Sequence, residues 1–318
     1  MFIHYKYPGY LMKEIVPKLL VIFILLLSLM AEVHGQTTAD EWQLKAIELA
    51  VGGNIEAAKI AFDEAIRLSP NDPYIPHIAG ITIAAKGDYK TAVDYFDEAV
   101  KINPRDDLSL LFKGDALQQL GRYDEAVDAY DASINLYSKN ADAWSHKGNA
   151  LLAQSGKEEE ALRAFDASLS IDASNDRVWL NKGDALAALG KYDNAISAYK
   201  QAIKNNPSNA DAYNNIGIAY YDQGQFEEAL KWFDGAIKER GDFAYKNWKC
   251  KTLWELSVNA GGGDWYKKYS DCEKDLEKHP DNPSNTGSSS TYGTGSSTPG
   301  TSSSGPFGGG PVIISHNI

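Results

Sequence analysis

The chain has 318 residues, with 31 Lys or Arg against 43 Asp or Glu, so its net charge at neutral pH is −12. Such an acidic chain is a poor match for nucleic acid or for an anionic membrane surface. This charge suits a basic protein partner, although an acidic surface can also serve solubility alone.

Residues 1–35 are typical of a secretory signal peptide. Lys6, Lys13 and Lys18 precede thirteen uncharged residues, Leu19 to Ala31. That apolar run is shorter than the roughly 20 residues of a membrane-spanning helix. Small residues at the third and last positions before Gln36 favour cleavage there, and an uncleaved membrane anchor is the alternative. We therefore expect a secreted or envelope protein whose mature form has no membrane span.

From residue 39 to residue 242 one pattern recurs every 34 or 35 residues. Its most regular members are glycines, each followed nine positions later by an aromatic residue. The glycines are Gly53, Gly87, Gly121, Gly156, Gly190 and Gly224, and the aromatic residues are Phe62, Phe96, Tyr130, Phe165, Tyr199 and Phe233. A fixed period of this length is typical of a solenoid, and solenoids bind rather than catalyse.

Each period predicts two amphipathic helices, because its apolar and small residues recur at spacings of three and four. The central glycine supplies a left-handed turn between the two helices. A second small residue lies seven or eight positions before each glycine, where two helices are expected to touch. Prolines close three of the units, at Pro70, Pro104 and Pro207.

This pattern resembles the tetratricopeptide repeat, and it is matched almost in full from Trp179 to Pro207. The resemblance implies an all-α, right-handed superhelical solenoid with six repeats over residues 39–242. It also implies a partner-binding groove lined by the first helices of successive repeats.

Residues 243–280 depart from the repeat and predict a degenerate seventh hairpin that caps the stack. Gly261 to Gly263 lengthen its turn, and Lys268 replaces the packing alanine. Cys250 and Cys272 are the only cysteines, one on each predicted helix. In an exported chain they are candidates for a disulfide, with two buried free thiols as the alternative.

Residues 281–318 predict a flexible tail. Fourteen of the 21 residues from Ser284 to Ser304 are Ser or Thr, and such a segment has too little apolar surface to offset the entropy of ordering. The tail is interpreted either as a cell-surface stalk or as a plain disordered end.

In the family, ligand contacts come mainly from the second, fifth, ninth, twelfth and thirteenth positions of the repeat. Carried over to this sequence, they give a candidate partner-binding groove. Its residues are Tyr74, His77, Ile81, Leu108, Leu111, Asp115, Gln118, Asp142, Ser145, Asn149, Leu180, Asp184, Asn214, Ile218, Tyr221 and Asp222.

This lining is apolar and acidic, with Arg177 as its one basic member. It lacks the Lys and Asn pair with which some family members clamp the acidic C-terminus of a chaperone. The resemblance therefore implies an extended peptide with basic and apolar side chains, whose main chain is held by Asn149 and Asn214. Any of these residues can instead be ordinary surface, and Leu180 or Ile218 can pack between repeats.

The sequence carries no recognisable catalytic motif. The six histidines are scattered, and no His-Glu-x-x-His motif, phosphate-binding loop or Gly-x-Ser-x-Gly motif is present. We expect no enzyme activity, no cofactor and no metal. The leading hypothesis is an extracytoplasmic scaffold for protein–protein interaction. A structural cell-surface component tethered through its tail is the second, and an enzyme with an unrecognised site is the third.

Overall fold

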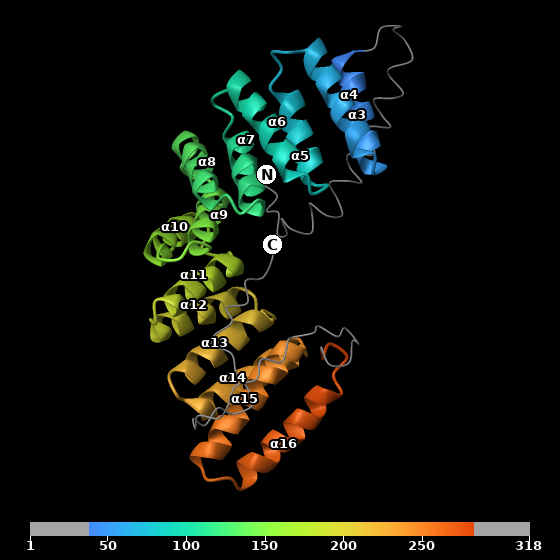
Figure 1. Ribbon diagram of the computed structural model, residues 1–318. Coiled ribbons are helices and arrows are strands. Elements are labelled where there is room, and N and C mark those ends of the chain that lie inside the picture. Colours follow the sequence, from blue (N-terminus) through green and yellow to red (C-terminus); the bar gives the residue numbers. More distant parts are fainter. Residues whose placement is uncertain (1–37, 283–318) are drawn as a thin grey trace, which may run out of the picture. The chain divides into compact units, whose positions relative to one another are not determined.

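The computed structural model describes residues 38–282, and this part of the chain folds into fourteen helices with no strand (Figure 1). Consecutive helices pair into seven hairpins. The predicted all-α repeat solenoid is confirmed. The predicted leader and most of the predicted tail lie outside the described residues. Within residues 38–282 no helix is both long enough and apolar enough to cross a membrane.

The chain divides into two compact units after Ala173, and each is described by itself. Unit 1 contains four hairpins: α3 (Ala39–Val51) with α4 (Ile55–Leu68), α5 (Tyr74–Ala84) with α6 (Tyr89–Ile102), α7 (Asp107–Gln119) with α8 (Tyr123–Leu136), and α9 (Ala141–Leu152) with α10 (Glu158–Ile171). Unit 2 contains three: α11 (Asp176–Ala188) with α12 (Tyr192–Asn205), α13 (Ala210–Asp222) with α14 (Phe226–Glu239), and α15 (Phe243–Asn259) with α16 (Asp264–Glu277).

The turn inside each repeat depends on its glycine. All six turn glycines have positive φ, between 70° and 86°. A residue with a Cβ atom is strained in that region, so the glycine allows the second helix to fold back. Several first helices begin at an Asn that caps them. The side chains of Asn140, Asn175 and Asn209 accept hydrogen bonds from free amides at the starts of α9, α11 and α13.

A second set of glycines brings the two helices of a hairpin into contact. Five glycines lie directly under the aromatic ring of their own repeat, and a Cβ atom placed on any of them would come within 2.3 to 2.6 Å of a ring atom. The pairs are Gly80 with Phe96, Gly114 with Tyr130, Gly148 with Phe165, Gly183 with Tyr199 and Gly217 with Phe233. These buried rings form the centre of each hairpin, as the small residues of the pattern predict.

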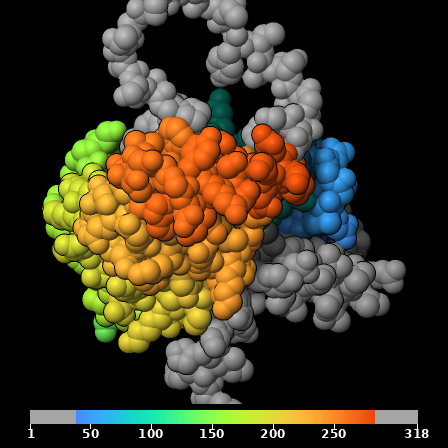
Figure 2. Space-filling view, turned by 90° about the horizontal axis from the view of Figure 1, so that it is seen from below, coloured from blue at the N-terminus to red at the C-terminus, as the bar shows by residue number. Residues whose placement is uncertain are grey.

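The last hairpin is built differently. A disulfide joins Cys250 of α15 to Cys272 of α16, with 5.6 Å between their Cα atoms. Three successive glycines with positive φ, Gly261 to Gly263, form its turn. Figure 2 shows α15 and α16, in orange and red, as the end face of unit 2. This hairpin is therefore the last layer of the described part of unit 2.

Candidate partner-binding faces

Each unit has an inner face made by its first helices. In unit 1 α3, α5, α7 and α9 contact one another in succession, and in unit 2 α11, α13 and α15 do the same. Among the described residues, no comparable contact joins successive second helices. Every residue of the predicted groove lies on one of these first helices.

Two of the exposed predicted residues in unit 1 are apolar. Tyr74 begins α5 and is 73% exposed, and Leu108 at the start of α7 is 47% exposed. Both occupy the second position of the repeat, 34 residues apart. The exposed Asp142 holds the same position on α9. We call Tyr74 and Leu108 the apolar pair of unit 1, because apolar side chains left in water on an interaction face can bind apolar groups.

His77 is engaged within the unit. Its Nδ1 atom lies 2.6 Å from the Ser109 hydroxyl, which also lies 2.6 Å from an Asp106 oxygen. Because the Ser109 hydroxyl donates its single proton to Asp106, it accepts from Nδ1–H of His77. Burial lowers the pKa of His77, and the nearby Asp106 charge partly opposes that shift. His77 therefore links α5 to α7 more than it serves a ligand.

Asp115 is also held by its neighbours. Its Oδ1 atom accepts a hydrogen bond of 2.8 Å from the Tyr130 hydroxyl and lies 2.7 Å from Nδ1 of His146 in the next repeat. Gln118 accepts a longer bond of 3.3 Å from the same hydroxyl. Burial raises the pKa of Tyr130 well above its usual range, and the Asp115 charge adds to that shift. Asp115 thus stabilises a junction between repeats.

Asp184 repeats this arrangement in unit 2. It accepts hydrogen bonds of 2.8 Å from the Tyr199 hydroxyl and 2.9 Å from the Asn215 side chain. Burial and the Asp184 charge raise the pKa of Tyr199, as they do for Tyr130 in unit 1. Asp115 and Asp184, two of the four acidic residues of the predicted groove, are therefore already hydrogen-bonded inside the solenoid.

The sequence does indicate which repeats have an Asp that accepts a hydrogen bond from the Tyr of the same repeat. Where the ring of the repeat is Tyr, the inner helix has Asp one residue after its contact glycine, as in Asp115 and Asp184. Where the ring is Phe, that position is not acidic, and two of the corresponding junctions are apolar. These are Ile81 with Phe96 and Phe112, and Ile218 with Phe233 and Trp248. The Phe96 and Phe112 rings stack at 6.2 Å, as do those of Phe233 and Trp248.

The remaining predicted residues differ in burial. Leu111 and Ser145 are buried, whereas Ile81, Asn149, Leu180 and Ile218 are partly exposed. The inner faces thus mix packing residues with accessible ones.

Asn214 has a polar atom that no described residue satisfies. Its side chain is 5% exposed. Its Nδ2 atom donates to Asn215 at 3.2 Å, whereas its Oδ1 atom is buried without a partner in residues 38–282. A buried acceptor of this kind is stabilised by a donor such as a peptide N–H or a water molecule.

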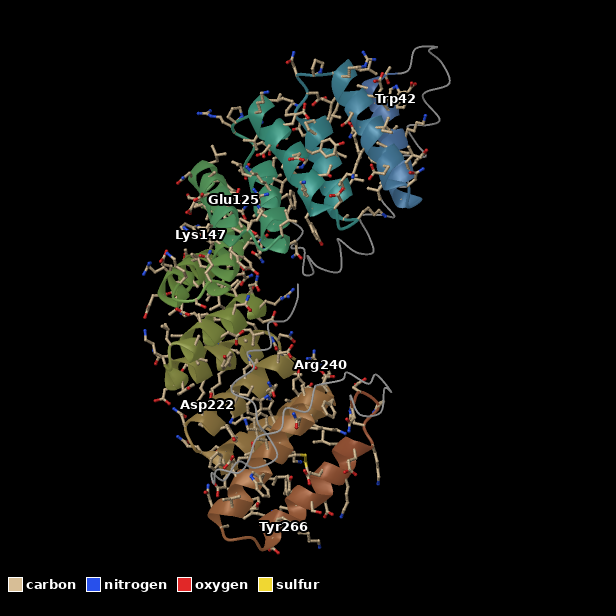
Figure 3. All side chains as sticks on the ribbon, viewed as in Figure 1. Trp42, Glu125, Lys147, Asp222, Arg240 and Tyr266 are labelled. Atoms are coloured by element: carbon tan, nitrogen blue, oxygen red, sulfur yellow. A yellow bond between two sulfur atoms is a disulfide. The ribbon has the colours of Figure 1, made fainter. Side chains whose placement is uncertain are left out.

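Lys251 of α15 was missed by the sequence interpretation. Its Nζ atom lies 5.0 Å from the ring centre of Tyr221 and 4.5 Å from that of Trp248. Asp222, labelled in Figure 3, lies at the end of α13, and partial withdrawal from water raises its pKa while the Lys251 charge lowers it. Lys251 is the ninth residue of α15, as Ile218 is of α13, but the 34-residue period of the sequence leads from Ile218 to Thr252 instead.

A second missed cluster joins the last two hairpins of unit 2. Arg240, also labelled in Figure 3, contacts Asp211 at 2.7 Å and Asp242 at 2.6 Å. The Tyr245 hydroxyl donates to Asp211 and also contacts Arg240. Asp211 therefore binds side chains of its own unit, although it holds the same repeat position as the exposed Tyr74.

The two units differ in charge. Residues 38–173 contain 13 Lys or Arg and 24 Asp or Glu, a net charge of −11. Residues 174–282 contain 15 and 17, a net charge of −2. Most of the net negative charge of residues 38–282 therefore belongs to unit 1. Among the described residues no group of His, Cys, Asp or Glu side chains has the geometry of a metal site.

A family model for the tetratricopeptide repeat matches residues 44–107, 111–176 and 180–244, which together make up more than half of the chain. The chain belongs to the tetratricopeptide repeat family. No curated protein matches its sequence.

Solved structures of tetratricopeptide repeat proteins are similar in fold. The C-terminal part of a repeat protein from Cytophaga hutchinsonii has a TM-score of 0.60 at 16% identity, over 74% of this chain and 93% of that one. YrrB, described as a TPR protein with an unusual peptide-binding site, has a TM-score of 0.50 at 22% identity, over 58% and 95% of the two chains. MamA has a TM-score of 0.50 at 24% identity, over 54% and 93%. At these identities the likeness concerns the fold alone.

Proposed function

We propose that this tetratricopeptide repeat protein is an extracytoplasmic scaffold that binds extended segments of partner proteins on its inner faces. The sequence of residues 1–35 supports the location, and the repeat family supports a role in binding. The fold supplies rigid helical faces, and no catalytic constellation was recognised in the sequence. The proposal assigns no enzyme activity to the chain.

The observation that carries the proposal is the apolar pair of unit 1. Tyr74 and Leu108 are exposed on neighbouring first helices in a unit with a net charge of −11. Apolar side chains of a partner can pack against Tyr74 and Leu108. Lys or Arg side chains of the same partner are attracted by the negative potential of the unit. The favoured ligand is an extended segment that mixes apolar and basic side chains.

Asn214 supports a separate contribution from unit 2. We propose that its Oδ1 atom, buried without a partner among residues 38–282, turns toward the inner face to accept a main-chain N–H, which every extended peptide offers regardless of sequence. Asn149 is proposed to serve the main chain in unit 1. Unit 2 would then add affinity, whereas unit 1 would add selectivity for side chains.

A selection from a random peptide library displayed on phage tests the proposal. We expect the full chain to enrich peptides in which Lys or Arg alternates with Leu, Ile or Phe. Changing both Tyr74→Ser and Leu108→Ser should abolish that enrichment. The matched control changes Leu136→Ser and Tyr137→Ser, which are similarly exposed at the end of the outer helix α8. Enrichment of acidic peptides, or equal effects of the two double variants, would contradict the proposal.

A further inference from the structure

The disulfide occupies the place of the glycine–ring contact that holds the other hairpins. Gly114, Gly148, Gly183 and Gly217 are each the eighth residue of their first helix, and Cys250 is the eighth residue of α15. The rings of the second helices are likewise eighth residues, whereas Cys272 is the ninth residue of α16. In the last hairpin a covalent bond thus joins the helices at the glycine position of α15 and one residue beyond the ring position of α16.

Apart from the disulfide, α16 packs on α15 mainly through Tyr269, whose ring lies 5.1 Å from that of Trp254, and it buries fewer residues than the second helices of the other hairpins. Its buried residues are only Tyr269 and Leu276, whereas α6 buries five residues and α10 six. Lys268 stands where the repeat has its packing alanine, and it is exposed. The ion pair between Lys246 and Asp275, at 3.0 Å, lies at the surface, where such pairs contribute little.

The neighbouring helix α15 has firm contacts of its own. Trp248 stacks on Phe233 of α14 with 6.2 Å between ring centres, and Lys249 pairs with Asp234 of α14 at 2.6 Å. The hydroxyl of Tyr245 donates to Asp211 of α13. None of these contacts involves α16, so α15 is expected to stay packed if α16 leaves.

We propose that the docking of α16 onto α15 is controlled by the redox state of Cys250 and Cys272. A dithiol reductant opens the bond in two steps. One thiolate of the reductant attacks Sγ of Cys272, which is partly exposed, and releases the fully buried Cys250 as a thiolate that takes up a proton. The second thiol of the reductant then displaces Cys272. The reductant becomes a disulfide, and the protein gains two thiols.

Release of α16 would uncover the side of α15 that carries Cys250, which is fully buried in the oxidised structure, and Trp254, which packs on Tyr269 of α16. The Gly261–Gly263 turn can serve as the hinge, because three glycines have the widest backbone freedom. The consequence is a terminal layer that is closed when oxidised and open when reduced.

Hydrogen exchange measured by mass spectrometry on the full chain tests this, with dithiothreitol as the reductant. The unreduced protein should first show no alkylatable thiol. Reduction should then speed amide exchange in α16 by about tenfold or more and leave α13 and α14 unchanged. Two free thiols in the unreduced protein, or unchanged exchange in α16 after reduction, would overturn the proposal.

Two double variants separate the covalent role from the packing role. Cys250→Ala with Cys272→Ala should show fast exchange in α16 under both conditions. Cys250→Gly with Cys272→Phe recreates the glycine–ring pair of the other repeats and should show slow exchange in α16 with or without dithiothreitol. If this second variant exchanges as fast as the first, the disulfide does not replace a packing contact and the proposal is wrong.

Discussion

The inner faces of the two units use the same backbone positions for different chemistry. At the second repeat position unit 1 exposes Tyr74 and Leu108, whereas unit 2 has Arg177 and the internally bonded Asp211. Unit 1 has a net charge of −11 and unit 2 of −2. One scaffold therefore presents an apolar, acidic face in one unit and a nearly neutral, amide-bearing face in the other.

A repeat position therefore does not by itself define a binding residue. Asp115 and Asp184 hold the family's ligand-contacting position, yet their carboxylates accept hydrogen bonds from buried tyrosines. Whether the residue binds a ligand or packs inside the solenoid depends on the aromatic residue of the second helix. A buried tyrosine hydroxyl needs a hydrogen-bond acceptor on the first helix, whereas a phenylalanine ring does not.

The largest expected change in the free energy of unfolding comes from removing the hydrogen bonds of Asp184 with Tyr199 and Asn215 in unit 2. Asp184→Ile leaves the hydroxyl of Tyr199 and the amide of Asn215 without their acceptor, and each buried orphan group costs about 1–3 kcal/mol. Adding Tyr199→Phe should recover part of that loss, because Ile with Phe is the combination at Ile218 and Phe233. Urea denaturation of the single and double variants measures both the stability lost in Asp184→Ile and the part recovered by Tyr199→Phe. A double variant less stable than Asp184→Ile alone would show that the junctions are not interchangeable.

A smaller loss of stability is expected when a methyl group is added at a glycine–ring contact in unit 1. In Gly114→Ala the new Cβ atom would lie 2.4 Å from the Tyr130 ring, so the ring or the helix must shift, at a cost of about 1–3 kcal/mol. Gly235→Ala in α14 of unit 2 is a milder comparison, because its Cβ would lie 2.9 Å from Tyr213. Thermal melting should order the two variants in this way, and a reversed order would contradict the packing account.

Much of the fold was predictable from the sequence, because period, glycine turns and small residues are local signals. The seven hairpins follow from them, and so does the altered last one. The functional face was less predictable. Counting positions placed His77, Asp115 and Asp184 on the correct helices, but their partners lie about 15 to 32 residues away, on other helices. Hydrogen bonds between repeats decide which side chains remain accessible, and those bonds depend on three-dimensional neighbours.

The smallest predicted effect concerns how the stability of unit 1 depends on pH. The pKa of His77 is lowered in the folded protein, so the unfolded chain takes up a proton more readily. The stability that neutral His77 contributes is full above its ordinary pKa of about 6.5 and is lost as the pH falls below it. His77→Gln should flatten the decrease in melting temperature between neutral and mildly acidic pH. An unchanged pH dependence in that variant would show that His77 does not contribute.

The most direct test of the account is the affinity of one selected basic, apolar peptide for three forms of the protein. Titration calorimetry should find binding weakened about tenfold or more by Tyr74→Ser with Leu108→Ser in unit 1. Arg177→Ser, at the equivalent position of unit 2, should leave the affinity unchanged or slightly higher. Added salt should weaken binding to the wild-type protein. A loss caused by Arg177→Ser and not by the unit 1 variant would contradict the assignment of selectivity to unit 1.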